Sequence, residues 1–68
     1  MKTLDYEWRS PHLAPMRRSV RILWCDRVIT RGNKFDAGNG NIRWYDSTTG
    51  TSHEEADVVG WTNLDGPL

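Results

Sequence analysis

Few residues in this chain are of types suited to catalysis, and their spacing does not bring them together. The sequence has two histidines, His12 and His53, and one cysteine, Cys25. A Cys–His nucleophile needs both groups within hydrogen-bond reach, and a structural zinc site takes several cysteines or paired histidines. The histidines are 41 residues apart and Cys25 falls in an apolar run, so we expect both histidines in solvent-facing loops. The sequence predicts no catalytic residue, no metal site, no cofactor and no enzymatic activity.

Carboxylates and glycines give equally weak signals for chemistry. Most acidic residues lie in polar stretches, whereas a general acid–base pair needs burial or a close charge. The glycines Gly32, Gly38 and Gly40 are not followed by a helical pattern. A phosphate-binding loop would therefore lack the helix that completes it.

Charged residues offer two more informative surfaces, of opposite sign. Residues 1–34 hold eight basic and three acidic side chains, a net charge of +5, and residues 35–68 hold one basic and six acidic, a net charge of −5. A basic set suited to the phosphates of a nucleic acid comprises Arg17, Arg18, Arg21, Arg27 and Arg31. A set that could enter a basic groove on another protein, together with the 32–41 segment, comprises Arg43, Tyr45, Asp46, Glu54, Glu55 and Asp57. Both sets could also serve only to keep a small domain soluble.

A chain of 68 residues makes one small domain, residues 1–68, which has little surface to bury. Four tryptophans at nearly even intervals supply large apolar areas: Trp8, Trp24, Trp44 and Trp61. The single Cys25 cannot form an internal disulfide, and we expect it to be a small buried hydrophobe in a reducing environment. No apolar run approaches the roughly 20 residues that span a bilayer, so we expect a soluble, cytoplasmic protein.

The apolar pattern predicts a mostly β domain, with a small α+β content at most. We expect a single compact antiparallel sheet of three to four strands around a tryptophan-rich core. The predicted strands cover residues 19–25, 28–31, 42–46 and 58–64. In the first strand Val20, Ile22 and Trp24 share one face while Leu23 and Cys25 are apolar on the other, so it is expected to be covered on both faces.

The remaining segments are predicted to be irregular. Residues 1–18 form an extended arm that lays Trp8 and Leu13 against the core, because Pro11 and Pro15 forbid a regular helix. We expect a tight turn at residues 26–27, a long mobile loop over 32–41, a turn over 47–52 and at most one helical turn over 53–57. Residues 65–67 end the last strand.

Several short motifs follow one another in an order that resembles a known family. They are Glu7-Trp8, Leu13-x-Pro15, the run VRILWCD, Trp44-Tyr45-Asp46 and Val58-x-x-Trp61-x-x-Leu64. Together they resemble a family of small phage and prophage proteins of unknown function, over residues 7 to 67. The chain departs from that pattern at Arg27, where a turn glycine is common, in its longer 32–41 loop and in its less proline-rich ending. The resemblance implies a small antiparallel sheet and a phage context, and it carries over no catalytic residue.

Three functions follow from these observations as hypotheses. The first is a non-enzymatic phage accessory protein that binds and inhibits a host or defence protein in the bacterial cytoplasm, with an anti-CRISPR inhibitor as its sharpest form. The second is a small nucleic-acid-binding module that uses the basic set. The third is a structural virion component. An exposed sheet edge would also allow a homodimer.

Overall fold

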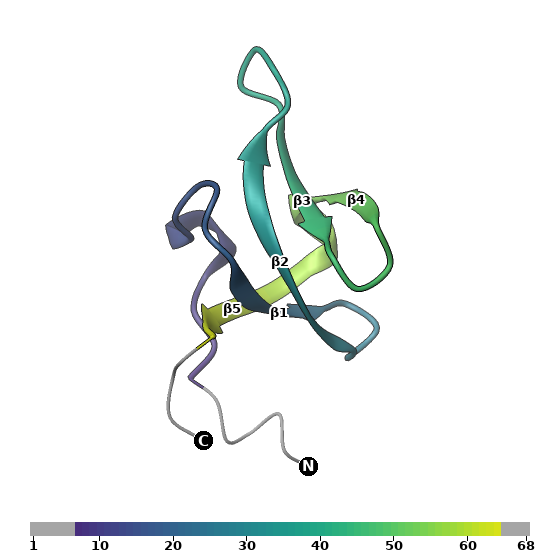
Figure 1. Cartoon of the computed structure of the whole chain (residues 1–68). Helices are drawn as coiled ribbons and strands as arrows, with labels where there is room; N and C mark the ends of the chain where they lie inside the picture. Colours follow the sequence, from purple (N-terminus) through teal and green to yellow (C-terminus); the bar gives the residue numbers. More distant parts are fainter. Residues whose placement is uncertain (1–6, 65–68) are drawn as a thin grey trace.

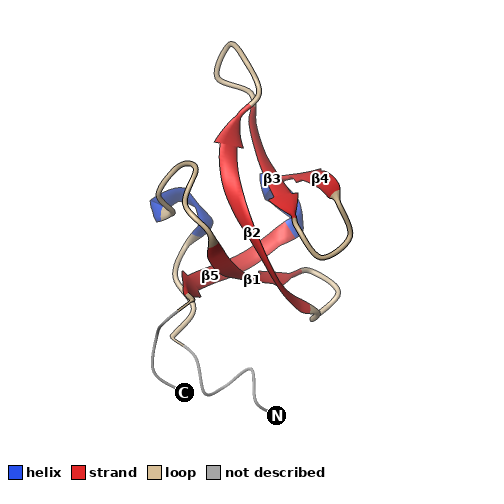
Figure 2. Ribbon diagram, in the orientation of Figure 1, coloured by secondary structure: helices blue, strands red, loops and turns tan. Residues whose placement is uncertain are grey.

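The computed structural model describes residues 7–64, which form one antiparallel five-stranded sheet with almost no helix (Figures 1 and 2). Its strands are β1 (Val20–Trp24), β2 (Ile29–Asp36), β3 (Ile42–Asp46), β4 (Thr51–Glu54) and β5 (Val58–Asn63). Two 3-10 turns, η2 (Pro11–Leu13) and η3 (Glu55–Asp57), precede β1 and β5. The predicted mostly β, antiparallel class is confirmed, whereas the predicted number of three to four strands is wrong.

The strand order is β4-β3-β2-β1-β5, so the last strand returns to pair with the first. The long strand β2 changes neighbours along its length, and Gly32 is the residue that pairs with both Val20 of β1 and Asp46 of β3. A Cβ atom at Gly32 would overlap the carbonyl oxygen of Tyr45 and lie 2.9 Å from Cδ1 of Ile22. Figure 1 shows β1 and β5 running across the direction of β2 and β3. The glycine therefore lets the backbones approach closely where the sheet bends.

One buried cluster fills the inside of the bent sheet. Its members are Ala14, Val20, Ile22, Trp24, Trp44, Val58 and Trp61. Trp44 is fully buried, and Trp8 is only half-buried and lies outside the cluster. The expectation that Leu13 packs on the core is wrong, because its side chain is 72% exposed.

The turn predicted at residues 26–27 is confirmed, and it explains an incorrect prediction for Cys25. The Trp24 N–H donates to the Val28 carbonyl (2.9 Å), and the Arg27 N–H donates to the Trp24 carbonyl (2.8 Å). Arg27 has φ 71°, the left-handed conformation that favours the glycine expected here from the family resemblance. Cys25 lies in this short loop and is exposed, so it is not the buried hydrophobe that was expected.

Two predicted loops are shorter in the structure because polar residues continue the strands. β2 extends to Asp36, so only residues 37–41 remain of the predicted 32–41 loop, and β4 begins inside the predicted 47–52 turn. Lys34, Trp44 and His53 are cross-strand partners in one row over β2, β3 and β4. Because Lys34 and His53 are polar, the apolar pattern of the sequence did not indicate the second half of β2 or β4. The predicted 53–57 turn is η3, starting at residue 55, and residues 65–67 lie outside the described part of the chain.

The described part of the N-terminal arm contacts the sheet at two places. Arg9 exchanges two backbone hydrogen bonds with Trp61, of 2.9 and 3.1 Å, along the outer side of β5. The Trp61 indole N–H donates to the Ser10 carbonyl (2.8 Å), and the Arg17 N–H donates to the Lys34 carbonyl (2.7 Å). The arm predicted to be extended over residues 1–18 contains, in its described part, the 3-10 turn η2, whose first residue is Pro11.

Lys34 joins the arm to the rest of the fold. Its side chain is only 6% exposed, and its Nζ donates to the carbonyls of Pro11 (2.8 Å) and His12 (3.4 Å). The same Nζ lies 3.1 Å from Oε2 of Glu55, in η3. A buried lysine of this kind needs its charge paired and its protons bonded, and these three partners meet that need. Within residues 7–64, no helix is long and apolar enough to cross a membrane.

Candidate functional site

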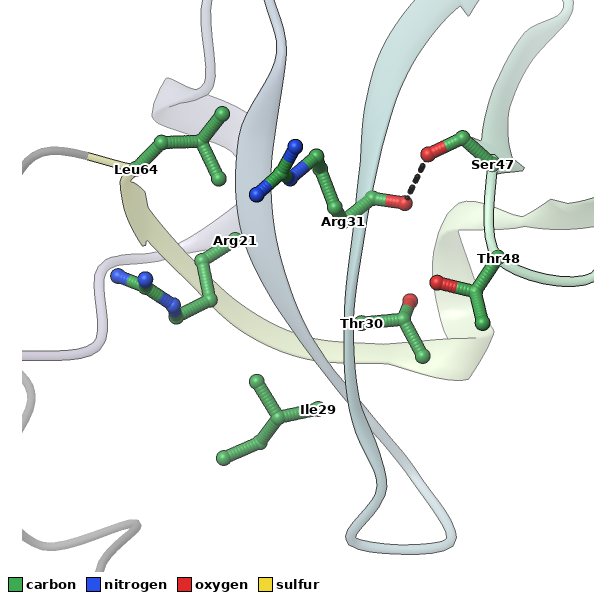
Figure 3. Close-up of a pocket in the computed structure, with 7 residues that line it drawn as sticks. All are labelled: Arg21, Ile29, Thr30, Arg31, Ser47, Thr48 and Leu64. Carbon is green, nitrogen blue, oxygen red and sulfur yellow. Dashed lines mark hydrogen bonds between the residues drawn. The ribbon is translucent and has the colours of Figure 1, made fainter.

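Two neighbouring cavities of opposite charge are the strongest candidates for a functional site. The first, here the aromatic–acidic pocket, has a volume of about 520 Å³, and its characteristic residues are Trp24, His53, Val28, Asp26, Asp46 and Asp57. The second, here the arginine pocket, has a volume of about 460 Å³, and its characteristic residues are Arg21, Arg31, Ile29, Ser47 and Leu64 (Figure 3). Thr30 and Thr48 line both cavities, so the two pockets share a wall.

The aromatic walls of the first pocket are held in place by the curl of the sheet. Trp24 ends β1 and His53 lies in β4, and their ring centroids are 4.9 Å apart with an interplanar angle of 62°, an edge-to-face contact. The Trp24 indole N–H donates to the Thr30 hydroxyl (2.6 Å). Nε2 of His53 is hydrogen-bonded to the Thr51 hydroxyl (2.9 Å), which also contacts the Thr49 hydroxyl (2.7 Å). Both rings are thus oriented by protein contacts before any ligand arrives.

Three carboxylates reach this pocket from three separate segments. Asp26 comes from the β1–β2 turn, Asp46 from the end of β3 and Asp57 from η3. Oδ1 of Asp26 accepts from the Val28 N–H (3.1 Å), and Oδ1 of Asp46 accepts from the Thr48 N–H (2.9 Å).

No cation of the described residues is paired with any of these three carboxylates. Within residues 7–64, none of them forms an ion pair, and no described residue donates a hydrogen bond to the second oxygen of Asp26 or Asp46. Asp46 is also buried, with 5% of its surface exposed. Carboxylates that line a cavity, with no cation of residues 7–64 paired to them, would attract a positive group placed in that cavity.

The arginine pocket is built on a like-charge pair. Arg21 of β1 and Arg31 of β2 stand directly opposite each other in the antiparallel register. Nη1 of Arg21 donates to the Asn63 carbonyl (3.3 Å), and the Ser47 hydroxyl donates to the Arg31 carbonyl (2.6 Å) (Figure 3).

The structure brings together only part of the predicted basic set. Arg21 and Arg31 line the arginine pocket, as described above. Arg17 and Arg18 belong to the exposed bend that leads into β1, and Arg27 belongs to the turn that follows β1. None of these three arginines lines either pocket.

The second predicted set is divided in the same way. Asp46 and Asp57 line the aromatic–acidic pocket, while Arg43, Tyr45, Glu54 and Glu55 do not. The Glu55 carboxylate pairs with buried Lys34, and Nη2 of Arg43 donates to the Ser52 carbonyl (3.2 Å). Tyr45 and Glu54 are exposed on β3 and β4.

Sequence reasoning missed the aromatic walls of the pocket. His12 is exposed as predicted, but the placement of His53 in a solvent-facing loop is wrong, because it is half-buried in β4. The alternation in β3 carried a usable signal, since it places Asp46 on the same face as buried Trp44. The contact between His53 and Trp24 could not be predicted from the sequence, because it depends on how the sheet is curved. Among the described residues, no group of three His, Cys, Asp or Glu side chains is arranged to hold a metal ion.

Comparisons with protein-family models, with curated proteins and with solved structures gave no match to this chain.

Proposed function

We propose that this domain is a non-enzymatic binding module for a partner protein, and that its aromatic–acidic pocket receives a lysine or arginine side chain of that partner. The observation that carries this proposal is the set of three carboxylates, free of ion pairs within residues 7–64, around a cavity walled by Trp24 and His53. The volume of about 520 Å³ falls within the range of ordinary ligand pockets.

A long basic side chain matches each part of this pocket. Its methylene groups can lie against Trp24 and Val28, while its charged end approaches Asp46 and Asp57. Hydrogen bonds between a charged donor and a carboxylate are about twice as strong as neutral ones. A cation near the face of a tryptophan gains about 0.5–2 kcal/mol more. Since both rings are already fixed by Thr30 and Thr51, little ordering cost is expected on binding.

The resemblance to phage proteins makes a host or defence protein the partner we propose, with anti-CRISPR inhibition as the sharpest form of the function. The acidic character of the pocket also argues against a nucleic acid as the main ligand. Nucleic-acid binding, a virion role and homodimer formation stay predictions.

The test is an NMR titration of the protein with Nα-acetyl-lysine amide. We expect the indole N–H signal of Trp24 and the amide signals of Val28 and Thr48 to shift with added ligand. The same compound acetylated at Nε has no charge and should cause no such shifts. In Asp57→Asn the shifts should weaken, because one carboxylate of the pocket is removed.

Glu54→Gln is the matched control for this titration. Glu54 is an exposed acid three residues from Asp57 and does not line the pocket. Its substitution should leave the shifts unchanged. If the charged and the acetylated compounds cause the same shifts, or if neither causes any at millimolar concentration, the proposed function is refuted.

A further inference from the structure

We infer that the outer edge of β4 pairs with an extended segment of the partner protein, and that this segment carries the basic side chain which enters the aromatic–acidic pocket. The inference rests on the proposed function, because it takes the basic residue in that pocket as given. It adds the conformation of the partner segment, which is a β-strand joined to the sheet by main-chain hydrogen bonds.

The two edges of the sheet differ in whether the protein itself covers them. β5 forms one edge, and the arm closes part of it through the two backbone hydrogen bonds between Arg9 and Trp61. β4 forms the other edge (Figure 2), and within residues 7–64 no strand or bridge other than β3 pairs with it. Every second residue of such an edge strand directs its N–H and C=O groups away from the sheet, where another strand can bond to them.

The residues of β4 are open to solvent. Thr51, Ser52 and Glu54 are exposed, and His53 is half-buried. Beyond the ladder with β3 and the turn η3, the described residues donate one further hydrogen bond to this backbone, from Nη2 of Arg43 to the Ser52 carbonyl (3.2 Å). A single side-chain hydrogen bond of this kind can be exchanged for a main-chain one at little cost.

One face of β4 lines the pocket, and a paired segment would place alternate side chains on that same face. Thr51 and His53 are two residues apart in the strand, and both line the aromatic–acidic pocket. Directly opposed residues of neighbouring strands have side chains on the same face, with Cβ atoms about 4.5–5.5 Å apart. A lysine or arginine paired with Thr51 or His53 would therefore lie on the pocket side of the sheet, next to residues that line the pocket.

Charge decides between two occupants of this edge, a second copy of the chain and a basic segment of another protein. Asp46 and Asp57 line the pocket, and no cation of residues 7–64 is paired with them, so a basic residue is favoured there. β4 itself reads Thr-Ser-His-Glu and contains no lysine or arginine. A second copy paired through its own β4 would bring neither residue to these carboxylates, so the basic segment is the better occupant.

The experiment uses fluorescently labelled seven-residue peptides with a central lysine between threonine and valine residues, and binding is measured by fluorescence anisotropy. In a series of peptides one backbone amide at a time is N-methylated, which removes one N–H donor and keeps the side chains. We expect the effect to alternate along the peptide, because only every second N–H faces β4. Methylation of a facing amide should weaken binding roughly three- to tenfold, as the loss of one hydrogen bond allows, and methylation of the amides between should have little effect.

Amide hydrogen exchange of the protein gives a second readout. One of the two consecutive amides of Ser52 and His53 faces away from β3, so it should exchange quickly in the free protein and more slowly with the lysine peptide bound. The Trp61 amide is the matched control, because it belongs to the other edge and already donates to the Arg9 carbonyl (3.1 Å). Its exchange should change much less.

The outcomes separate this inference from the proposed function. If N-methylation at every position leaves the affinity unchanged while Nε-acetylation of the lysine abolishes binding, the inference is overturned and the proposed function stands. If no lysine peptide binds, both are overturned. If the outward amide of β4 becomes protected as the protein concentration rises, without any peptide, a second copy occupies the edge and the inference is overturned.

Discussion

Replacing buried Lys34 with methionine should bring the domain close to unfolding. The substitution keeps the length of the side chain but removes the Nζ that bonds to the carbonyls of Pro11 and His12 and pairs with Glu55. Breaking a buried ion pair by removing one partner costs about 3–5 kcal/mol. A domain of this size has a total free energy of unfolding of about 3–10 kcal/mol. Lys34→Met should therefore lose a large share of the stability, and the arm should detach first.

The partner substitution should have a smaller effect, because the two sides of the pair differ in burial. Glu55 is 23% exposed, and in Glu55→Gln the lysine keeps both carbonyl acceptors. We expect this variant to lose about 1–2 kcal/mol. The double variant should lose less than the sum of the two single losses, since both remove the same contact.

The assay is urea unfolding followed by tryptophan fluorescence, with Arg18→Met as the control. Arg18 is an exposed arm residue, so its substitution should change the free energy of unfolding by less than about 0.5 kcal/mol. A loss below about 1 kcal/mol in Lys34→Met would refute the reasoning, because it would mean that the buried contacts of Nζ add little net stability.

Three further substitutions probe the frame around the site, each measured by the same urea unfolding. Gly32→Ala should lose more than about 3 kcal/mol, because its Cβ would overlap the Tyr45 carbonyl oxygen; a near-neutral result would contradict the close packing at the bend. Arg27→Gly should gain about 0.5–1 kcal/mol by relieving the positive φ of 71°, and a loss would show that the Arg27 side chain stabilises the turn. Trp61→Phe should lose about 1–3 kcal/mol, because the Ser10 carbonyl loses its indole donor, and an unchanged stability would show that this bond is dispensable.

The parts of the fold that sequence could predict are those whose side chains alternate in polarity. β1, β3 and β5 lie within one or two residues of the predicted ranges, because residues such as Ile22 and Trp44 mark their inner face. β4 and the second half of β2 were missed, because Lys34 and His53 occupy inner positions that an apolar pattern cannot reveal. The groups that compensate the charge of Lys34 lie 21 to 23 residues away in the chain, so the residues next to Lys34 in the sequence do not indicate that it is buried.

The candidate site was predictable only in fragments. Arg21 and Arg31 belong to the predicted basic set, and the strand register places them directly opposite each other. Asp46 and Asp57 were expected on an exposed acidic surface, whereas the structure assigns them to a cavity whose walls include Trp24. The order of charged residues in the sequence does not distinguish Asp57 from Glu55. Asp57 lines the pocket, whereas Glu55 pairs with Lys34.

The most direct test of the central claim uses Cys25, which is exposed and lines the aromatic–acidic pocket. The measurement is the rate of Cys25 alkylation by iodoacetamide with a saturating lysine-containing peptide and with its Nε-acetylated form. We predict that the charged peptide slows alkylation, that the acetylated peptide does not, and that the protection is weakened in Asp57→Asn but kept in Glu54→Gln. Equal alkylation rates with and without the charged peptide, at concentrations where the peptide binds, would contradict a basic side chain in this pocket.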